Sequence, residues 1–219
     1  VCYLGKSGWQ GIAGARDEGH AAAAVESLKK DGADIMGWQY VNLSDNKEIE
    51  SSAKGIANAY PTLSLLINNA GIPGDMAVRS YEQSLQDVID TVQVNYIGTF
   101  LLTKLLLPVL EKNHGRICNI TVPSSFSPFW HPMAYVASKA GQNTMVSTMA
   151  WEFEHFNVPV EIFDIHPGAT STDLNGHYSG PGSHMPSTIG EKVAAIINDG
   201  KRHNGEFIEL YPIVDEGNY

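Results

Sequence analysis

The stretch Leu63-Ser-Leu-Leu-Ile-Asn-Asn-Ala-Gly71 decides the fold class. Its first five residues, Leu63 to Ile67, form a short apolar run, which is typical of a strand buried on both faces of a parallel sheet. The sequence Asn68-Asn69-Ala70-Gly71 then supplies turn-forming residues where that strand would end. Ligands of open parallel sheets bind at the carboxyl ends of the strands. This turn is therefore the first candidate for a binding site.

Segments of strand and helix character alternate on both sides of this stretch. The expected strands are residues 11–15, 35–43, 63–67, 116–122, 160–165 and 206–211. The expected helices are residues 18–30, 45–60 (with Ser44 or Asp45 as cap), 84–113, 133–156 and 186–198. This alternation predicts an α/β fold with a doubly wound, Rossmann-like parallel sheet. We expect residues 1–219 to form a single domain.

The N-terminal residues do not follow the pattern that such a sheet predicts. A nucleotide-binding sheet should begin with a strand, a glycine-rich turn and a helix. Four glycines recur at every third position between residues 5 and 14, which is the wrong spacing for G-x-G-x-x-G, and no apolar strand precedes them. We interpret Val1 to Ser7 as the end of a first helix. The first βα unit is then largely missing, and the chain is expected to be N-terminally truncated.

Bulk composition excludes several classes of protein. The net charge of −10, without any basic cluster, argues against binding to nucleic acid. The most apolar stretch, Phe100 to Leu110, is interrupted by Lys104 and Pro108, so we expect no membrane span. Two cysteines indicate no disulfide framework and favour a reducing, cytoplasmic location. His131 and His177 stand in loops without a spaced cluster of ligands, so we expect no metal site.

Tyr135 and Lys139 are the clearest candidates for chemistry. They lie four positions apart in an expected helix, so their side chains share one face. A nearby ammonium favours the phenolate and lowers the pKa of a tyrosine, which makes its hydroxyl useful in acid–base catalysis. Asn95 adds a polar side chain in an otherwise apolar helical stretch, where it requires partners. It is either a structural amide or the holder of a water molecule near Lys139.

Taken together, these motifs resemble the short-chain dehydrogenase/reductase family, in its carbonyl-reductase-like branch. Asn68 to Gly71, Asn95, Tyr135 to Lys139, and His166-Pro167-Gly168 with Thr172-Asp173-Leu174 stand in the family's order, and the resemblance runs from about Trp9 onward. It implies hydride transfer between a nicotinamide dinucleotide and a carbonyl or alcohol. By this resemblance, Tyr135 would protonate the carbonyl oxygen, Lys139 would bind the nicotinamide ribose and tune Tyr135, and Asn95 would hold a relay water.

The same resemblance, with the local sequence, gives the cofactor site. The expected cofactor-binding residues are Arg16, Asn42, Leu43, Asn69, Ala70, Gly71, Tyr135, Lys139, Pro167, Gly168, Thr170 and Thr172. An acidic residue at the tip of the second strand would select NAD, but here Ala15 is followed by Arg16, whose guanidinium suits a phosphate. NADP is therefore preferred over NAD, unless Arg16 only pairs with Asp17 or Glu18. Without the family's glycine-rich loop, cofactor affinity should be poor and the sheet should expose an unpaired edge.

A second departure concerns the hydroxyl that normally accompanies the tyrosine. The family places a serine thirteen residues before it, and here that position is Val122. Ser124 is the leading substitute because the chain turns after Pro123, while Thr121 and Ser125 are the alternatives. It also stays open that no hydroxyl fills this role.

The composition of two loops suggests the substrate, and the family resemblance suggests how the chain assembles. Aromatic residues between Phe126 and His131 suggest an apolar substrate wall, or else packing against the core or another subunit. Residues 175–185 have the composition of a mobile lid. We expect a reductase for a hydrophobic or aromatic carbonyl or secondary alcohol, assembled as a homodimer or homotetramer. The alternatives are a dinucleotide-binding sensor without turnover, and an epimerase or dehydratase that uses the same tyrosine–lysine pair.

Overall fold

The strands and helices follow one another in the predicted alternation. The structure, a computed structural model, describes residues 1–124 and 132–211. The strands are β1 (Gly11–Ala15), β2 (Ile35–Tyr40), β3 (Leu65–Asn68), β4 (Arg116–Ile120), β5 (Glu161–His166) and β6 (Phe207–Glu209). The α-helices are α1 (Cys2–Lys6), α2 (Glu18–Lys30), α3 (Asn46–Ala59), α4 (Leu85–Val92), α5 (Thr99–Lys112), α6 (Met133–His155) and α7 (Pro186–Ile197). Three shorter helical pieces are η1 (Ser80–Glu82), η2 (Gln93–Gly98) and η3 (Asp173–Asn175).

All described strand pairs are parallel, which confirms the α/β, Rossmann-like prediction. β1 pairs with β2, and β3, β4, β5 and β6 pair in that order. The strands therefore form two sheets and not the single sheet expected, because no described strand is hydrogen-bonded to both β1 and β3. β1 and β3 each keep one edge unpaired among the described strands. The expected N-terminal truncation stays a prediction.

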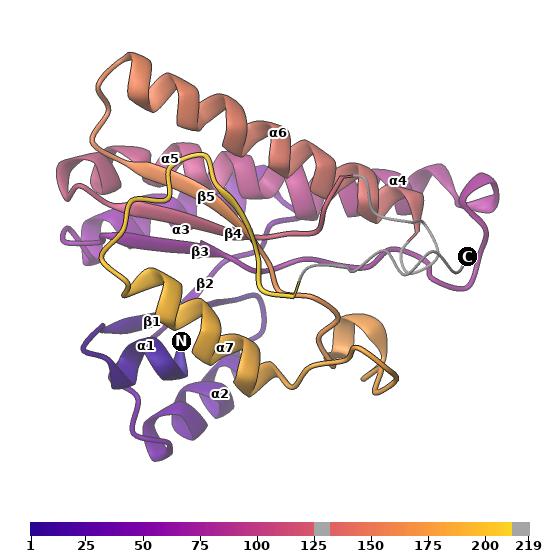
Figure 1. The fold of residues 1–219 in the computed structure, drawn as a ribbon, viewed down its shortest axis with the longest axis horizontal. Helices are drawn as coiled ribbons and strands as arrows, with labels where there is room; N and C mark the ends of the chain where they lie inside the picture. Colours follow the sequence, from indigo (N-terminus) through magenta and orange to yellow (C-terminus); the bar gives the residue numbers. More distant parts are fainter. Residues whose placement is uncertain (125–131, 212–219) are drawn as a thin grey trace.

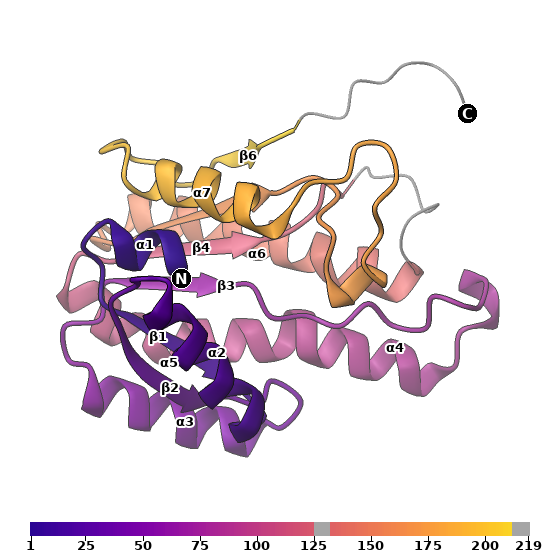
Figure 2. The ribbon, with the colours of Figure 1, turned by 90° about the horizontal axis from the view of Figure 1, so that it is seen from below.

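Helices cover both faces of the sheets, as Figures 1 and 2 show. On one face, α3, α5 and α6 pack over a core that includes Ile49, Leu106, Ile117 and Ile162, all fully buried. On the other face, α1 and α7 pack over Phe163 and its neighbours. The two cores arise because successive residues of a strand point to opposite faces of the sheet.

Local sequence signals explain where the helices begin. The Asp17 side chain accepts a hydrogen bond from the His20 backbone N–H at the start of α2. Asp45, one of the two expected caps, accepts from the N–H groups of Lys47 and Glu48 at the start of α3. Such caps satisfy N–H groups that have no partner within the helix.

The long helix predicted for residues 84–113 is interrupted by a π-helical segment. α4 and α5 are joined through η2, whose residues Gln93–Gly98 form a π-helix, with Asn95 fully buried inside it. A π-helical turn inserts extra backbone into a helix and is frequent at functional sites. Here it changes the direction in which the side chains around Asn95 project.

The joined helix Leu85–Lys112 is also long and apolar enough, by length and composition, to cross a membrane. Within its most apolar window, 44% of the residues are buried inside the protein. The core helix of a protein that never meets a membrane passes the same test, so this feature is weak evidence for a span. The expectation of no membrane span stays a prediction.

Loops that carry the predicted motifs gather at one edge of the larger sheet. The segments after β3 and β5 leave the strands on the same side, to the right in Figures 1 and 2. This follows from the parallel pairing, because all four strands end at the same edge. The site is built at this edge.

Candidate active site

Tyr135 and Lys139 lie on one face of α6 and are both buried, with 6% and 3% of their surface exposed. The Lys139 Nζ lies 5.8 Å from the centre of the Tyr135 ring. It donates hydrogen bonds to the Ile120 carbonyl at 2.8 Å and to Gln142 Oε1 at 3.0 Å. The lysine is thus fixed by the end of β4 and by its own helix. The structure brings together the pair that the sequence predicts.

Burial dominates the acid–base properties of this pair. It raises the pKa of Tyr135 to about 12, so the hydroxyl is protonated at neutral pH. It lowers the pKa of Lys139 to about 8, while the Asp164 carboxylate acts in the opposite direction. A Tyr135 pKa below its usual value, as expected beside Lys139, is not what the structure shows, because burial raises it. A protonated tyrosine is suited to donate a proton.

Asn95 joins the turn after β3 to α6. Its Oδ1 accepts from the Ile72 N–H at 2.8 Å, and its Nδ2 donates to the Ile72 carbonyl at 2.9 Å and to Ser138 Oγ at 3.1 Å. The Asn95 carbonyl accepts from Gln142 Nε2 at 2.5 Å. The side chain is therefore a structural amide that holds the turn next to α6. Whether it also holds a relay water stays a prediction.

At Gly71 the turn after β3 approaches the side chains of Asn95 and Lys139 closely. A Cβ atom at this position would lie 3.1 Å from Asn95 Oδ1 and 3.9 Å from Lys139 Nζ. The turn Asn68 to Gly71 therefore passes directly over the buried polar groups, and the absence of a side chain keeps that approach open.

A row of polar side chains crosses the sheet below the lysine, and sequence reasoning missed most of it. Asn68, Asn119 and Asp164 are in register on β3, β4 and β5, and all three are buried. Asn68 Nδ2 donates to Asn119 Oδ1 at 2.6 Å and to Thr103 Oγ1 at 3.0 Å. The available signal was a polar residue inside each of two apolar strands, Ile117-Cys-Asn119-Ile and Ile162-Phe-Asp164-Ile.

Asp164 is the charged member of this row. Burial raises the pKa of its carboxyl to about 7, and the Asn119 amide and the Lys139 ammonium act in the opposite direction. Its Oδ1 atom and the Asn119 Nδ2 atom have no hydrogen-bond partner among the described residues.

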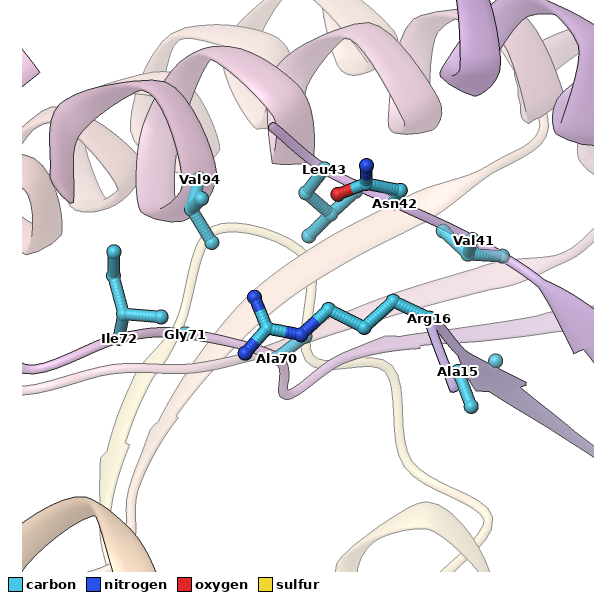
Figure 3. Close-up of a pocket in the computed structure, with 10 residues that line it drawn as sticks. Ala15, Arg16, Val41, Asn42, Leu43, Ala70, Gly71, Ile72 and Val94 are labelled. Carbon is cyan, nitrogen blue, oxygen red and sulfur yellow. The ribbon is translucent and has the colours of Figure 1, made fainter. Parts of the chain in front are cut away.

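A pocket lies beside the turn after β3, and several of the expected cofactor residues line it. Its walls come from the ends of β1 and β2, the turn after β3, and η2; they are Gly14, Ala15, Arg16, Val41, Asn42, Leu43, Ala70, Gly71, Ile72 and Val94. Figure 3 shows the Arg16 side chain extending into this pocket, between the Asn42–Leu43 segment and Ala70. Asn69 is exposed next to it.

Arg16 itself is exposed and forms no ion pair with a residue that the structure describes. The alternative that it only neutralises Asp17 or Glu18 is therefore not what the structure shows. Asp17 instead caps α2 and approaches His20 at 3.0 Å. A cation at the rim of a pocket that has no partner within residues 1–124 and 132–211 suits an anionic ligand.

Asn42 lies in the pocket wall, but its side-chain amide already forms hydrogen bonds within the protein. Its Oδ1 accepts from the Ser44 N–H at 3.1 Å and from Ser44 Oγ at 2.8 Å, and its Nδ2 donates to Glu48 Oε2 at 2.7 Å. Both lone pairs of the oxygen are thus used. Asn42 orders the start of α3, and its expected role in binding the cofactor stays a prediction.

The second expected cofactor loop begins at the end of β5. Gly168 has a φ of +76°, a conformation that favours glycine. Thr170 Oγ1 donates to the Gly168 carbonyl at 3.2 Å, and the Thr172 N–H donates to Asn175 Oδ1 at 3.1 Å. Pro167 is half-buried at the base of the loop. These residues lie at the same edge of the sheet as the turn after β3, but the Thr170 hydroxyl has a local partner.

The segment expected to act as a lid is tied to this loop. His184 donates its N–H to the Ala169 carbonyl at 2.8 Å, and its carbonyl accepts from the Ser171 N–H at 3.0 Å. The His184 ring also stacks on Tyr211 with centres 3.4 Å apart. A lid role stays a prediction.

The structure narrows the candidates for the missing serine. Thr121 is 2% exposed and donates its hydroxyl to Asn143 Oδ1 at 2.6 Å, so that hydroxyl is held by α6. Val122 is half-buried, and Ser124 is exposed in a turn just after it. No described contact joins Ser124 to Tyr135. Ser125 and the aromatic segment Phe126 to His131 lie outside the described residues.

Within residues 1–124 and 132–211, no group of three or more His, Cys, Asp or Glu side chains is placed to hold a metal ion. His177 pairs instead with Asp173 at 2.7 Å on the surface.

Comparison with known proteins places this geometry in a family. The family model described as short chain dehydrogenase matches residues 1–180. A short-chain dehydrogenase/reductase of Armillaria gallica is 26% identical over 200 residues, which cover 79% of this chain and 61% of the relative. A 3-oxoacyl-[acyl-carrier-protein] reductase of Staphylococcus epidermidis is 31% identical over 171 residues, which cover 76% of this chain and 66% of the relative. The chain thus spans less than two thirds of the length of these relatives.

The fold also matches solved structures. An alcohol dehydrogenase of Thermococcus sibiricus, complexed with 5-hydroxy-NADP, superposes with a TM-score of 0.84 at 22% identity. The match covers 100% of this chain and 92% of that chain. At this identity the match establishes the fold and nothing more.

Proposed function

The chain belongs to the short-chain dehydrogenase family, and we propose that it is an NADP(H)-dependent oxidoreductase for a hydrophobic or aromatic carbonyl or secondary alcohol. The observation that carries the proposal is the buried pair Tyr135 and Lys139, placed at the carboxyl edge of the sheet beside Gly71. Such a pair has no evident structural use that would require burying a lysine. The finer assignment to a carbonyl-reductase-like branch is part of the same proposal.

The residues at the edge of the sheet fit a nicotinamide dinucleotide. The pocket beside β1 and β2 has Arg16 at its rim, which pairs with no carboxylate of the described residues, and small residues in its floor, Ala70 and Gly71. The position of Gly71 leaves room directly above Asn95 and Lys139, which a Cβ would fill. When bound, the cofactor would supply or accept the hydride. Arg16, Leu43, Ala70 and Gly71 would hold its adenosine half, and Lys139 with the loop from Pro167 its nicotinamide half.

Tyr135 supplies the proton in the reductive direction. Its hydroxyl is protonated at neutral pH, because burial raises its pKa to about 12. It would donate that proton to the carbonyl oxygen as the oxygen gains negative charge, which is general acid catalysis. A charged Lys139 stabilises the phenolate that remains. Asn95 keeps the turn after β3 in place during this step.

Two features support a preference for NADP(H). Arg16 extends into the pocket, and no described carboxylate pairs with it. A guanidinium binds a phosphate through two parallel hydrogen bonds, whereas a ribose hydroxyl offers no charge to match. The Thermococcus sibiricus protein, of the same fold, is complexed with an NADP derivative.

We assign the substrate-facing hydroxyl to Ser124. It follows Val122 on the segment that leaves β4, and Thr121 is held away by Asn143. A hydroxyl at this point could donate a hydrogen bond to the substrate oxygen.

The test is a fluorescence titration with NADPH and NADH, followed by a panel of aromatic and aliphatic carbonyls with each cofactor. We expect tighter binding of NADPH and oxidation of NADPH with at least one aromatic ketone or aldehyde. Binding without turnover on any carbonyl would identify a dinucleotide sensor instead. A protein that binds neither cofactor would overturn the proposal.

A further inference from the structure

Asp164 is a buried charge that the proposed function does not use. It lies in the middle of β5 with 2% of its surface exposed, between Ile162 and His166 on the same face of the strand. Its Oδ1 atom has no hydrogen-bond partner among the described residues. A buried carboxylate is costly unless it is paired. A residue of this kind in the centre of a sheet calls for a specific counterpart.

Lys139 of α6 is held close to this part of β5. Its Nζ donates to the Ile120 carbonyl of β4, and Ile120 is in register with Ile165, the residue that follows Asp164 on β5. The Asp164 carboxylate raises the pKa of Lys139, and the ammonium lowers the pKa of Asp164, so each favours the charged form of the other. The two groups that accept hydrogen bonds from Lys139 Nζ, the Ile120 carbonyl and the Gln142 amide, are both uncharged. Asp164 is therefore the charged group that acts on Lys139.

Asn119 links the two elements. Its Oδ1 atom is turned toward β3, because it accepts from Asn68 Nδ2 at 2.6 Å. The Nδ2 atom is therefore directed toward β5, where Asp164 is its partner in register. The Asn119 amide favours the carboxylate form of Asp164. The row across the sheet thus directs the Asn119 amide dipole toward the Asp164 carboxylate.

Other titratable groups around Asp164 do not replace it in this role. The Tyr135 hydroxyl on α6 is neutral at pH 7, and the Cys118 thiol on β4 has its pKa raised by burial and by Asp164. His166 of β5 pairs with Glu209 of β6 at 3.6 Å, and burial lowers its pKa. The described parts of β3, α5 and η2 contribute the uncharged side chains Asn68, Thr103 and Asn95 to this region.

We propose that Asp164 is a positioning residue that keeps the buried Lys139 ammonium charged beside Tyr135. The proposal deepens the proposed function and rests on it for its catalytic meaning. A buried lysine with only neutral partners tends to lose its proton. A neutral lysine would neither stabilise the tyrosinate nor attract an anionic cofactor. The carboxylate acts through Lys139 and does not touch the reacting atoms.

The direct test is a titration of Lys139 by NMR in the full chain without cofactor, with lysine side chains isotopically labelled and Lys139→Met used for assignment. In the wild type, the Lys139 signal should shift with the ionisation of Asp164 near pH 7 as well as with its own titration near pH 8. In Asp164→Asn, the first step should disappear and the lysine should titrate about one pH unit lower, a tenfold change in proton affinity.

Asp31→Asn is the matched control, since it removes the same charge from an exposed position at the end of α2. It should leave both steps unchanged. An unchanged Lys139 titration in Asp164→Asn would overturn the proposal. If that variant does not fold, the wild-type titration still decides, because a single step without any inflection near pH 7 contradicts the coupling.

The second test is the pH profile of turnover with NADPH and a carbonyl that the wild type accepts. In Asp164→Asn, the alkaline limb of kcat should move about one unit toward lower pH, whereas a purely structural role would lower kcat at every pH alike. Asp164→Glu should restore part of the wild-type profile. If the wild type turns over no substrate, the proposed function fails, while the NMR titration still decides the role of Asp164.

Discussion

At the scale of single residues, burial sets the chemistry of the site. Tyr135 and Lys139 are both titratable side chains in a nearly dry environment, and each is driven toward its neutral form. The sequence predicted the pair because four positions in a helix make one face. It could not predict the direction of the shift in the Tyr135 pKa, because that depends on how much water the surrounding elements exclude.

The first prediction concerns the proton donor. Tyr135→Phe keeps the ring and removes the hydroxyl, so the fold and NADPH binding should be retained while kcat falls about 100-fold or more. The measurement is steady-state turnover alongside NADPH fluorescence titration. Tyr40→Phe, which removes an exposed hydroxyl bound to Glu48, should leave kcat unchanged. Turnover of Tyr135→Phe within a few-fold of wild type would contradict the mechanism.

The second prediction concerns the stability contributed by Asp164. Its folded-state pKa is raised from 3.8 to about 7, so between these values the folded protein binds a proton that the unfolded chain has released. The free energy of unfolding therefore falls as the pH rises through this window. Asp164→Asn removes the titrating carboxyl, so this fall in the free energy of unfolding should be absent in the variant.

Relative to the wild type, the variant should gain stability between pH 4 and pH 7, by on the order of a few kcal/mol. Part of the gain is cancelled because Lys139 loses its counter-charge. Urea unfolding at pH 4, 5, 6 and 7 measures it. A stability difference that does not change with pH would argue against a buried, titrating carboxylate.

At the scale of elements, the π-helical turn η2 shapes the site. Gly98 ends this segment against the backbone of Leu43, and a Cβ there would collide with the Leu43 carbonyl and approach Leu43 Cβ at 2.9 Å. The sequence indicated a helix over residues 84–113, but helical periodicity contains no signal for one extra residue per turn. Packing of η2 against the end of β2 decides it.

The third prediction follows from this contact. Gly98→Ala should destabilise the protein by roughly 1–3 kcal/mol, because the backbone of Leu43 has to move. Gly55→Ala is the matched control, since Gly55 lies in α3 with open space around its Cα. That variant should stabilise the protein by about 0.5–1 kcal/mol through helix propensity. Thermal unfolding of both variants measures the difference. Equal changes in stability for the two variants would mean that Gly98 is not packed tightly against Leu43.

At the scale of the whole molecule, the pocket exists because separate elements end at the same place. Arg16 directly follows β1, Leu43 follows β2, and Gly71 lies in the turn after β3. Their positions in sequence are far apart, and only the parallel order of the strands brings them together.

The fourth prediction uses this arrangement. Arg16→Ala should raise the Kd for NADPH about tenfold, because a charge-assisted contact is lost, and should leave the Kd for NADH nearly unchanged. Arg202→Ala, which removes an exposed arginine paired with Glu154, is the control and should change neither. An equal rise in the Kd for NADPH and for NADH in Arg16→Ala would show that Arg16 does not recognise a phosphate.

The fifth prediction concerns assembly. We propose a homodimer or homotetramer formed through α5 and α6. Large apolar side chains are exposed there, namely Phe100 of α5, Trp151 of α6 and Phe156 directly after α6. Trp151→Glu should shift the mass measured by light scattering toward the monomer, because it places a charge in an apolar contact. The same mass in wild type and variant would exclude Trp151 from the interface. A monomeric wild type would refute the assembly.

The sequence by itself determined the alternation of strands and helices, the parallel fold and the pairing of Tyr135 with Lys139. These properties depend on local periodicity and on spacing along one helix, which are visible in one dimension. The sequence did not reveal the polar row from Asn68 to Asp164, the engagement of Asn42 and Thr121, or the division of the strands into two sheets. These were decided by tertiary structure, because register between strands and the exclusion of water depend on residues that are distant along the chain.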